Sequence, residues 1–339
     1  MIITIRKKAS LKEIGALMKF IESQNIKIHI SKWESKTIFG MISEIKGPIK
    51  EQLSQFSAVE SMVPITKPYK LASLDFKPEP TRIKVNGSII GGGSFTVMAG
   101  PCAVESKEQI IEIALFAKEC GAHILRGGAF KPRTSPYSFQ GLGLEGLKYL
   151  AAAKEKSGLP IITEVVSAED AKMVSEYADI LQIGARNMQN YALLTAAGSL
   201  GKPVMLKRGM MATIEEFLLA AEYILKAGTD NVILCERGIR NFETSTRNVL
   251  DITAVPYIKS LSHLPIIVDP SHATGKRDLV PPLAKAALAV GADGIMVEIH
   301  KEPEKAQSDG PQSLHFPTFK NLMQELTALY PALRPTLKA

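Results

Sequence analysis

The sequence contains no run of eighteen or more apolar residues, the length that a membrane-spanning helix needs. From Met1 it begins with an alternating strand pattern, not with a charged region followed by an apolar run, so no export signal is expected. Cysteine is scarce: Cys102, Cys120 and Cys235 lie far apart and form no CxxC pair, which argues against a disulfide framework or a zinc knuckle. We therefore expect a cytoplasmic protein with no membrane partner.

Clusters of basic residues are also lacking. The formal net charge is +7, but the lysines and arginines are scattered singly and do not alternate with aromatic residues. A nucleic-acid partner is therefore not expected. Small anionic substrates or an ordinary excess of surface lysine both account for the charge.

The first seventy or so residues alternate between strand and helix patterns. IITIRKK alternates, and Leu11, Ile14, Leu17 and Ile21 then repeat at helical spacing behind Ser10, the expected N-cap. The other predicted segments are strands at 26–30 and 37–45, a helix around 49–56 and a last strand, VPITKPY, at 63–69. This order predicts a ferredoxin-like βαββαβ domain over residues 1–72.

Residues 73–94 are predicted to form a linker and a hairpin. The segment LDFKPEP carries two prolines, and RIKVNGSII then has an Asn86-Gly87 turn between two apolar stretches. We expect this hairpin to cover the bottom of the domain that follows.

From residue 95 to 339, short apolar strands alternate eight times with helical segments. Such near-continuous apolar runs are typical of parallel strands buried on both faces. The strands are FTVMAGP, HILRGGAF, PIITEVV, DILQIG, PVMLKRG, NVILCERG, PIIVDPSH and GIMVEIH. Eight such units predict a (β/α)8 TIM barrel. A doubly wound sheet is the rival, but IIGGGSF precedes a strand and lacks the spacing of a dinucleotide loop.

Reactive residue types recur where the predicted strands end, which is where a barrel of this kind builds its active site. They are Cys102, Arg126, Lys131, Arg133, Glu164, Arg186, Lys207, Arg237, Asp269, His272, Glu298 and Asp309. A merely solvated rim would show lysine and glutamate at random positions. The pattern therefore predicts an active site.

One subset of these residues suits a divalent metal ion. It offers a thiolate, an imidazole and two carboxylates, from Cys102, His272, Glu298 and Asp309. Each has another interpretation: the cysteine as packing, the histidine as a turn cap after Pro270, and the acids as partners of nearby lysines. No HExxH-like motif supports the metal.

A second subset is cationic and comes from four different strands. It consists of Arg126, Lys131, Arg186, Lys207 and Arg237. So many like charges repel one another unless anions bind there, so the set predicts recognition of phosphate and carboxylate groups. Ion pairing with Glu164, Glu236 or Asp269 is the alternative.

These residues, in this order, resemble 3-deoxy-D-arabino-heptulosonate 7-phosphate (DAHP) synthase, the entry enzyme of the shikimate pathway to chorismate and the aromatic amino acids. The resemblance extends from about Met98 to Leu314. It rests on the motifs AGPCAVES, LRGGAFKPRTSPYSFQGLG, ITEVVS, QIGARNMQN, PVMLKRGM, CERGIRNFE, VDPSHATGKRDLV and VEIHKEPEKAQSDGPQSL. The chain is similar to the compact type I beta branch, which has a ferredoxin-like or ACT-like amino-terminal domain and no fused chorismate mutase.

The resemblance implies a role for each candidate residue. The metal ligands of the family fall on Cys102, His272, Glu298 and Asp309. The phosphoenolpyruvate site falls on Arg126, Lys131, Glu164, Ala185, Arg186, Lys207 and Arg237. Erythrose 4-phosphate is expected at Arg133, Thr134 and Ser135, and the implied catalytic residues are Lys131, Cys102 and His272.

The implied reaction joins phosphoenolpyruvate to erythrose 4-phosphate and water, with one divalent ion (Mn, Fe, Co or Zn) acting on the aldehyde. Lys131 is expected either to transfer a proton or to anchor substrate. The resemblance also implies a homo-oligomer, often a tetramer, and feedback control by an effector such as tyrosine or phenylalanine at the amino-terminal domain.

Three other functions remain open. The first is a related synthase such as 3-deoxy-D-manno-octulosonate 8-phosphate synthase, although the KPRTSPYSFQGLG segment favours the seven-carbon product. The second is a Schiff-base aldolase with Lys207 as nucleophile. The third is an amino-acid sensor on an inert barrel.

Overall fold

A computed structural model describes residues 1–32, 37–41, 45, 47–63, 67–133 and 135–334. The chain forms two compact units, Met1–Glu79 and Pro80–Ala339. The predicted linker and hairpin segment, 73–94, is divided between them: its first residues belong to the first unit and its hairpin to the second.

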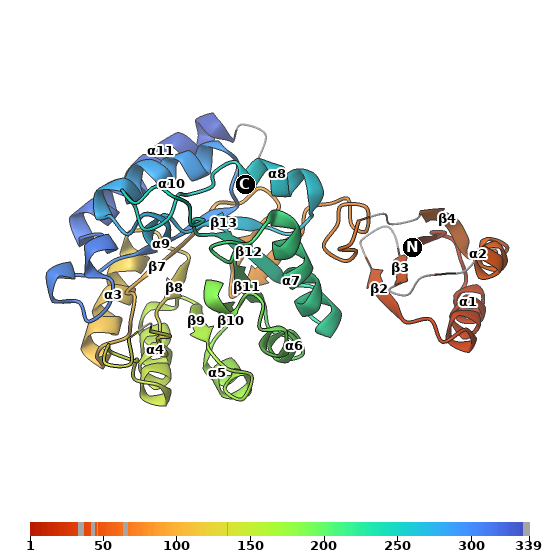
Figure 1. Cartoon of the computed structure of the whole chain (residues 1–339), viewed down its shortest axis with the longest axis horizontal. Coiled ribbons are helices and arrows are strands. Elements are labelled where there is room, and N and C mark those ends of the chain that lie inside the picture. Colours follow the sequence, from red (N-terminus) through yellow and green to blue (C-terminus); the bar gives the residue numbers. More distant parts are fainter. Residues whose placement is uncertain (33–36, 42–44, 46, 64–66, 134, 335–339) are drawn as a thin grey trace. The chain divides into compact units, whose positions relative to one another are not determined.

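The first unit is a four-stranded antiparallel sheet with two helices (Figure 1). The strands lie in the order β2-β3-β1-β4, which is the order of a ferredoxin-like fold, so this prediction is confirmed. The elements are β1 (Ile2–Ile5), α1 (Leu11–Ser23), β2 (Ile28–Lys32), β3 (Thr37–Met41), α2 (Gly47–Ser54) and β4 (Val59–Val63).

Helix α1 begins where its sequence predicts. The Ser10 hydroxyl accepts from the Glu13 amide, and the Glu13 carboxylate accepts from the Ser10 amide, which together form a capping box. Leu17 and Ile21 are fully buried and pack in one core with Phe39 of the sheet. The apolar stripe of the helix is therefore its buried face.

The last strand described in this unit begins earlier than predicted. We expected a strand at 63–69, whereas β4 covers Val59–Val63 and pairs with β1 from Ile5↔Val59 to Ile2↔Val63. Residues 64–66 of the expected segment lie outside the described residues. Residues 59–63 each have an amide N–H for the ladder, and they follow α2 closely. The expected segment contains prolines, which lack that N–H.

The second unit opens with the predicted hairpin, β5 (Ile83–Val85) and β6 (Ser88–Ile90). Asn86 and Gly87 both have positive φ angles, 42° and 87°, as a two-residue type I′ turn requires. The hairpin side chains Ile83, Val85 and Ile90 share a core with residues in the lower half of the barrel strands, such as Ile124 and Met205. The hairpin therefore covers the amino-terminal end of the barrel.

Eight parallel strands close into a barrel in the order β10-β11-β12-β13-β14-β7-β8-β9, which confirms the (β/α)8 prediction. They are β7 (Thr96–Gly100), β8 (Ile124–Arg126), β9 (Ile161–Val165), β10 (Ile180–Ile183), β11 (Val204–Lys207), β12 (Val232–Glu236), β13 (Ile266–Val268) and β14 (Gly294–Glu298). Almost every strand residue is buried, because side chains pack both inside the barrel and against the helices.

Helices surround the strands (Figure 1). They are α3 (Lys107–Glu119), α4 (Leu144–Ser157), α5 (Ala171–Tyr177), α6 (Tyr191–Gly198), α7 (Ile214–Ala227), α8 (Ala254–Leu261), α9 (Pro270–Thr274), α10 (Val280–Ala289) and α11 (Phe316–Leu333). The part of the chain that the structure describes also contains short 3-10 turns: η1 (Ala185–Asn187), η2 (Arg277–Leu279), η3 (Pro303–Lys305) and η4 (Gly310–Gln312). Of the helices in the described part of the chain, none has the length and apolarity needed to span a membrane.

Candidate active site

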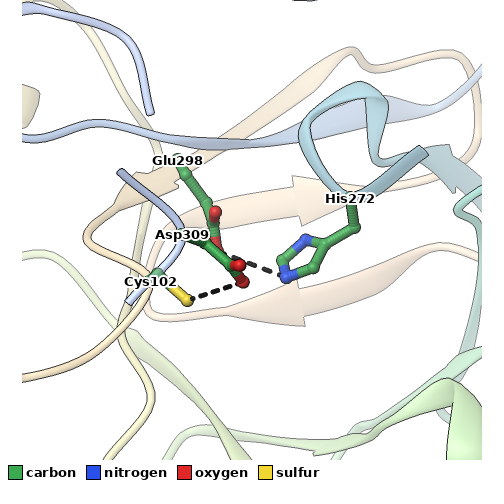
Figure 2. Close-up of side chains that lie close together, drawn as sticks. All are labelled: Cys102, His272, Glu298 and Asp309. Carbon is green, nitrogen blue, oxygen red and sulfur yellow. Dashed lines mark hydrogen bonds and ion pairs between the residues drawn. The ribbon is translucent and has the colours of Figure 1, made fainter. Parts of the chain in front are cut away.

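Four donor side chains converge at the carboxyl ends of three neighbouring strands. Cys102 follows β7, Glu298 ends β14, and His272 lies on α9 directly after β13. Asp309 comes from the long segment after β14, between η3 and η4. Figure 2 shows the four side chains pointing toward a common centre.

The spacing of these donors fits a single cation. One atom from each of Cys102, His272, Glu298 and Asp309 lies within 4.8 Å of all the others. His272 Nε2 is 3.3 Å from Glu298 Oε1, and Cys102 Sγ is 3.4 Å from Asp309 Oδ2. Ligand atoms about 2.0–2.3 Å from one ion lie within about 4.6 Å of each other. The four side chains therefore need only small movements to bind the same ion.

The imidazole of His272 is held by a buried carboxylate. Its Nδ1 lies 2.7 Å from Asp269 Oδ2, and its backbone amide donates to Asp269 Oδ1 at 2.9 Å. Burial lowers the pKa of His272 even though Asp269 and Glu298 oppose the shift. A neutral ring that donates Nδ1–H to Asp269 has its Nε2 lone pair directed at the centre, as a metal ligand requires.

Glu298 is fully buried and both of its carboxylate oxygens are bonded. Oε1 accepts from Arg126 Nη1 at 2.9 Å, and Oε2 accepts from Gln312 Nε2 at 2.5 Å. Burial raises the pKa of Glu298, but His272 and Arg126 outweigh it, so the pKa lies below its usual value. The carboxylate is therefore ionised and fixed in direction.

The thiol of Cys102 depends on its surroundings for ionisation. Burial, with a contribution from Glu298, raises its pKa to about 12, although Lys131 acts in the opposite direction. A nearby divalent cation favours the thiolate strongly. A bound cation would therefore convert Cys102 from a thiol into the thiolate that serves as a metal ligand.

Asp309 closes the cluster. Burial raises its pKa, but His272 and Arg247 lower it more, to about 2. Its backbone has φ 52°, a left-handed conformation that is uncommon for a residue other than glycine. Arg247 Nη2 binds its Oδ1 at 3.2 Å, which leaves the second oxygen toward Cys102.

A cavity of about 420 Å³ opens beside this cluster. The lining includes seven lysine and arginine side chains and two acidic ones, together with His272. The cations are Lys131, Arg133, Arg186, Lys207, Arg237, Arg240 and Arg247. This excess of positive charge in a concave site suits a ligand with several negative charges.

The cations nearest the cluster are held by specific contacts. Lys131 is buried, with Nζ 3.0 Å from Cys102 Sγ, and Lys207 Nζ is 2.5 Å from Asp269 Oδ2. Arg237 Nη2 donates to the carbonyl of His272, whereas its buried Nη1 has no hydrogen-bond partner within the described residues. A buried guanidinium nitrogen without a partner is costly, and an anionic ligand would satisfy it.

Other predicted residues lie around the same cavity. Glu164, Ala185 and Arg186 line it, and Glu164 packs so closely on Gly184 that a Cβ there would lie 2.0 Å from its carboxylate. Arg133 and Ser135 also contribute to the lining. Thr134 lies outside the described residues.

The structure places Arg126 differently from the other predicted anion-binding residues. Its side chain bonds to Glu298 and to the Pro101 carbonyl, and it lines a second, very small polar cavity with Lys131 and Glu164. Arg126 therefore contacts the donor cluster through Glu298 and is not among the residues that line the large cavity.

Sequence reasoning missed several residues of the cavity wall. Arg240, Arg247 and Asn248 come from the long segment after β12, and Gln182 comes from inside β10. The first three follow the motif CERG within a connection of seventeen residues, 237–253, between β12 and α8, and the length of that loop was a usable signal. Gln182 had a signal too, as a polar residue in an apolar strand.

The fold and the site together define a class: a barrel enzyme in which a donor set that suits a transition-metal ion adjoins a cavity lined mainly by cationic side chains. The sequence profile of the DAHP synthetase I family matches residues 75–331, and that of the DAHP synthase ferredoxin-like domain matches residues 1–67. The chain belongs to the DAHP synthetase I family, as its motifs predict.

Relatives support the assignment. A protein from Thermotoga maritima named phospho-2-dehydro-3-deoxyheptonate aldolase is 55% identical over 98% of both chains. A crystal structure under that name, also called DAHP synthase, is 54% identical, has a TM-score of 0.78 and covers 98% of this chain and 97% of that one. A truncated form from the same organism covers 78% of this chain and 97% of that one, with 56% identity and a TM-score of 0.73.

More distant relatives carry another name. A protein from Cyanothece sp. named 2-dehydro-3-deoxyphosphooctonate aldolase is 33% identical and covers 73% of this chain and 96% of its own length. A protein of that name from Syntrophobacter fumaroxidans is 31% identical over 76% of this chain and 94% of its own. These relatives match about three quarters of this chain, whereas the first-named relative matches 98% of it.

Proposed function

We propose that this chain is a DAHP synthase: it condenses phosphoenolpyruvate with erythrose 4-phosphate and water, giving DAHP and phosphate in the first step of the shikimate pathway. One observation carries the proposal. His272 and Asp309 belong to the metal-capable cluster and also line the cationic cavity, so an ion and an anionic substrate would meet there. The name and high identity of the Thermotoga relative support the same reaction.

The proposed cofactor is one divalent ion held by Cys102, His272, Glu298 and Asp309. Mixed sulfur, nitrogen and oxygen donors suit Mn, Fe, Co or Zn. When bound, such an ion acts as a Lewis acid toward the aldehyde oxygen of the sugar phosphate.

Phosphoenolpyruvate is proposed to bind in the cationic part of the cavity. Arg186, Lys207 and Arg237 would hold its phosphate and carboxylate groups, with Arg126 and Lys131 on the side of the donor cluster and Glu164 and Ala185 beside it. Fixing both reactants in one orientation replaces a costly bimolecular encounter. Nη1 of Arg237, which has no hydrogen-bond partner among the residues that the structure describes, favours an anion at this point.

Lys131 is proposed as the residue that either moves a proton or anchors substrate. Its ammonium contacts Cys102 Sγ, and the residue also lines the cavity. An arginine at this position would keep the charge but would not release a proton near neutral pH. Loss of turnover with retained phosphoenolpyruvate affinity in Lys131→Arg would therefore assign proton transfer.

Erythrose 4-phosphate is proposed to bind the segment after β8, through Arg133, Thr134 and Ser135. Arg133 and Ser135 line the cavity and Arg133 also contacts Ser308, next to Asp309. A phosphate there would leave the aldehyde end free to approach the donor cluster.

The test is a condensation assay on metal-stripped protein. Activity should disappear after chelation and return with Mn, Fe, Co or Zn ions, and DAHP should form from erythrose 4-phosphate. Preferential use of arabinose 5-phosphate would instead support the octulosonate synthase reaction named for the 31–34% identical relatives.

The same assay separates the Schiff-base alternative. Lys207 forms an ion pair with fully buried Asp269, an arrangement that suits a protonated ammonium and not a nucleophilic amine. Borohydride added with substrate should therefore leave activity intact. Trapping of a reduced adduct on Lys207 would contradict the proposed mechanism.

For the amino-terminal unit we propose regulation of the barrel by an aromatic amino acid such as tyrosine or phenylalanine, with residues 1–72 as the regulatory domain, 73–94 as linker and hairpin, and 95–339 as the catalytic domain. Its ferredoxin-like sheet and its profile match support a role distinct from catalysis. A cytoplasmic homotetramer is the proposed form, and light scattering of the purified protein would test the subunit count.

A further inference from the structure

Asp269 belongs neither to the metal donor set nor to the cations of the cavity, yet it touches both. It follows β13 and its side chain is fully buried. A buried carboxylate is costly unless its oxygens are bonded, so its partners indicate its role. All three side-chain contacts described for it go to His272 and Lys207.

One oxygen of Asp269 is shared between the two sites. Oδ2 lies 2.7 Å from Nδ1 of His272 and 2.5 Å from Nζ of Lys207. Oδ1 accepts from the backbone amide of His272 at 2.9 Å. The backbone at Asp269 is held as well, because its amide donates to the Glu236 carbonyl at 2.8 Å.

The three contacts of the Asp269 side chain need a group that accepts hydrogen bonds and donates none. Each partner of Asp269 presents an N–H: a ring nitrogen, an ammonium and a backbone amide. An asparagine would have to direct an NH₂ group at one of these donors, or leave one of them without an acceptor. A carboxylate is therefore the matching group.

Sharing one oxygen makes the two contacts compete for the same negative charge. A cation on Nε2 makes the Nδ1–H of His272 a stronger donor to Asp269, which leaves Lys207 less tightly paired and more available to an anion. An anion that attracts Lys207 leaves more of the negative charge of Asp269 to interact with His272, which makes the imidazole a stronger metal ligand. Binding of the cation and binding of the anion therefore favour each other.

We propose that Asp269 is a positioning residue that links metal binding to phosphoenolpyruvate binding, so that each ligand raises the affinity for the other. The inference rests on the proposed function, since it needs both ligands. The link is reciprocal: the factor by which phosphoenolpyruvate raises metal affinity equals the factor by which metal raises phosphoenolpyruvate affinity.

The test measures binding without turnover. Mn²⁺ and phosphoenolpyruvate are added to metal-stripped full-length protein, singly and together, with no sugar phosphate. Free Mn²⁺ is followed by electron paramagnetic resonance and phosphoenolpyruvate by calorimetry. In the wild type each ligand should raise the affinity for the other by about tenfold.

Asp269→Asn should lower Mn²⁺ affinity by about 10- to 100-fold and reduce the mutual enhancement to about onefold. Asp293→Asn is the matched control. Asp293 is also buried and pairs with a lysine, Lys259, at 2.8 Å, but it precedes β14 at the opposite end of the barrel. It should retain the wild-type enhancement.

A second measurement does not depend on the folding of a variant. Histidine-selective ¹⁵N spectra of the metal-free wild type should show the Nδ1 resonance of His272 shifting when phosphoenolpyruvate alone is added. An unchanged resonance with bound phosphoenolpyruvate would overturn the link, as would equal enhancement in Asp269→Asn.

The outcomes also separate this inference from the proposed function. Wild-type protein that binds both ligands independently contradicts the link alone. Protein that binds neither Mn²⁺ nor phosphoenolpyruvate contradicts the proposed function and the link with it.

Discussion

At the scale of single residues, the donor cluster shows how strongly burial changes side-chain chemistry. Cys102 keeps its proton in the bare cluster because burial raises its pKa to about 12, whereas the pKa of Asp309 falls to about 2 beside His272 and Arg247. Two groups 3.4 Å apart thus differ widely in acidity. A divalent cation would bring both into the same ionised state.

Replacing the sulfur ligand tests this view. Cys102→Ser should weaken metal binding and lower the condensation rate by at least about 100-fold, because even outer partners of metal ligands contribute 10- to 100-fold. Metal content and rate with added Mn²⁺ are measured. Cys120→Ala is the control, since Cys120 caps α3 outside the cluster, and wild-type behaviour of both variants would contradict the assignment.

Glu13 gives a pH-dependent prediction in the first unit. Hydrogen bonds from Ser10 and Ser57 lower the pKa of Glu13 from 4.5 to about 2. Because the folded pKa lies below the unfolded one, the ionised carboxylate stabilises the unit above about pH 4.5, and this stability is lost as the pH falls toward 2. The difference in free energy of unfolding between wild type and Glu13→Gln should therefore decrease as the pH falls from about 4.5 toward 2.

The carboxyl ¹³C resonance of Glu13 reports the same property directly. Its NMR titration midpoint should lie near 2. A midpoint near 4.5 would mean that the capping box does not form in solution.

At the scale of elements, the turns after the strands place the catalytic side chains. Gly128 follows β8, and a Cβ there would lie 2.8 Å from Lys131 Cδ and 2.9 Å from the carbonyl oxygen of Cys102. No such contact is tolerated without movement. The close approach of these two loops therefore depends on glycine.

Gly128→Ala should consequently displace Lys131 or Cys102 and lower the condensation rate by about 100-fold, since misplacement by about 1 Å can have that effect. Gly15→Ala is the matched control, because nothing lies within 4 Å of its added Cβ. Within α1 it should stabilise the fold by about 0.5–1 kcal/mol and leave the rate unchanged. Equal rates for the two variants would contradict the prediction.

At the scale of the whole molecule, the two units support separate roles. The donor cluster and the cavity lie entirely within Pro80–Ala339. A truncated form of the Thermotoga maritima relative has a solved structure that covers 78% of this chain.

Deleting Met1–Glu79 should therefore leave a folded barrel that retains metal-dependent condensation but loses inhibition by tyrosine or phenylalanine. Initial rates are measured with and without each amino acid for the full and shortened chains. Undiminished inhibition of the shortened chain would refute regulation by the amino-terminal unit.

The architecture could be predicted from the amino-acid sequence alone, because secondary structure follows local periodicity. The eight apolar segments, the Ser10 cap and the Asn86-Gly87 turn each carry their signal within a few residues. Where that signal was weak, the prediction failed: the strand Val59–Val63 contains Glu60 and Ser61 in succession and was placed too late.

Which side chains contact one another became clear only from the folded chain. Barrel closure brings Cys102 into contact with Asp309, which lies more than two hundred residues later in the chain. It also brings Arg126 into an ion pair with Glu298. It also shares the Asp269 carboxylate between His272 and Lys207, and adds Arg247 to the cavity. These contacts depend on strand order and loop path, which bring together residues far apart in the chain, whereas local periodicity specifies only neighbours.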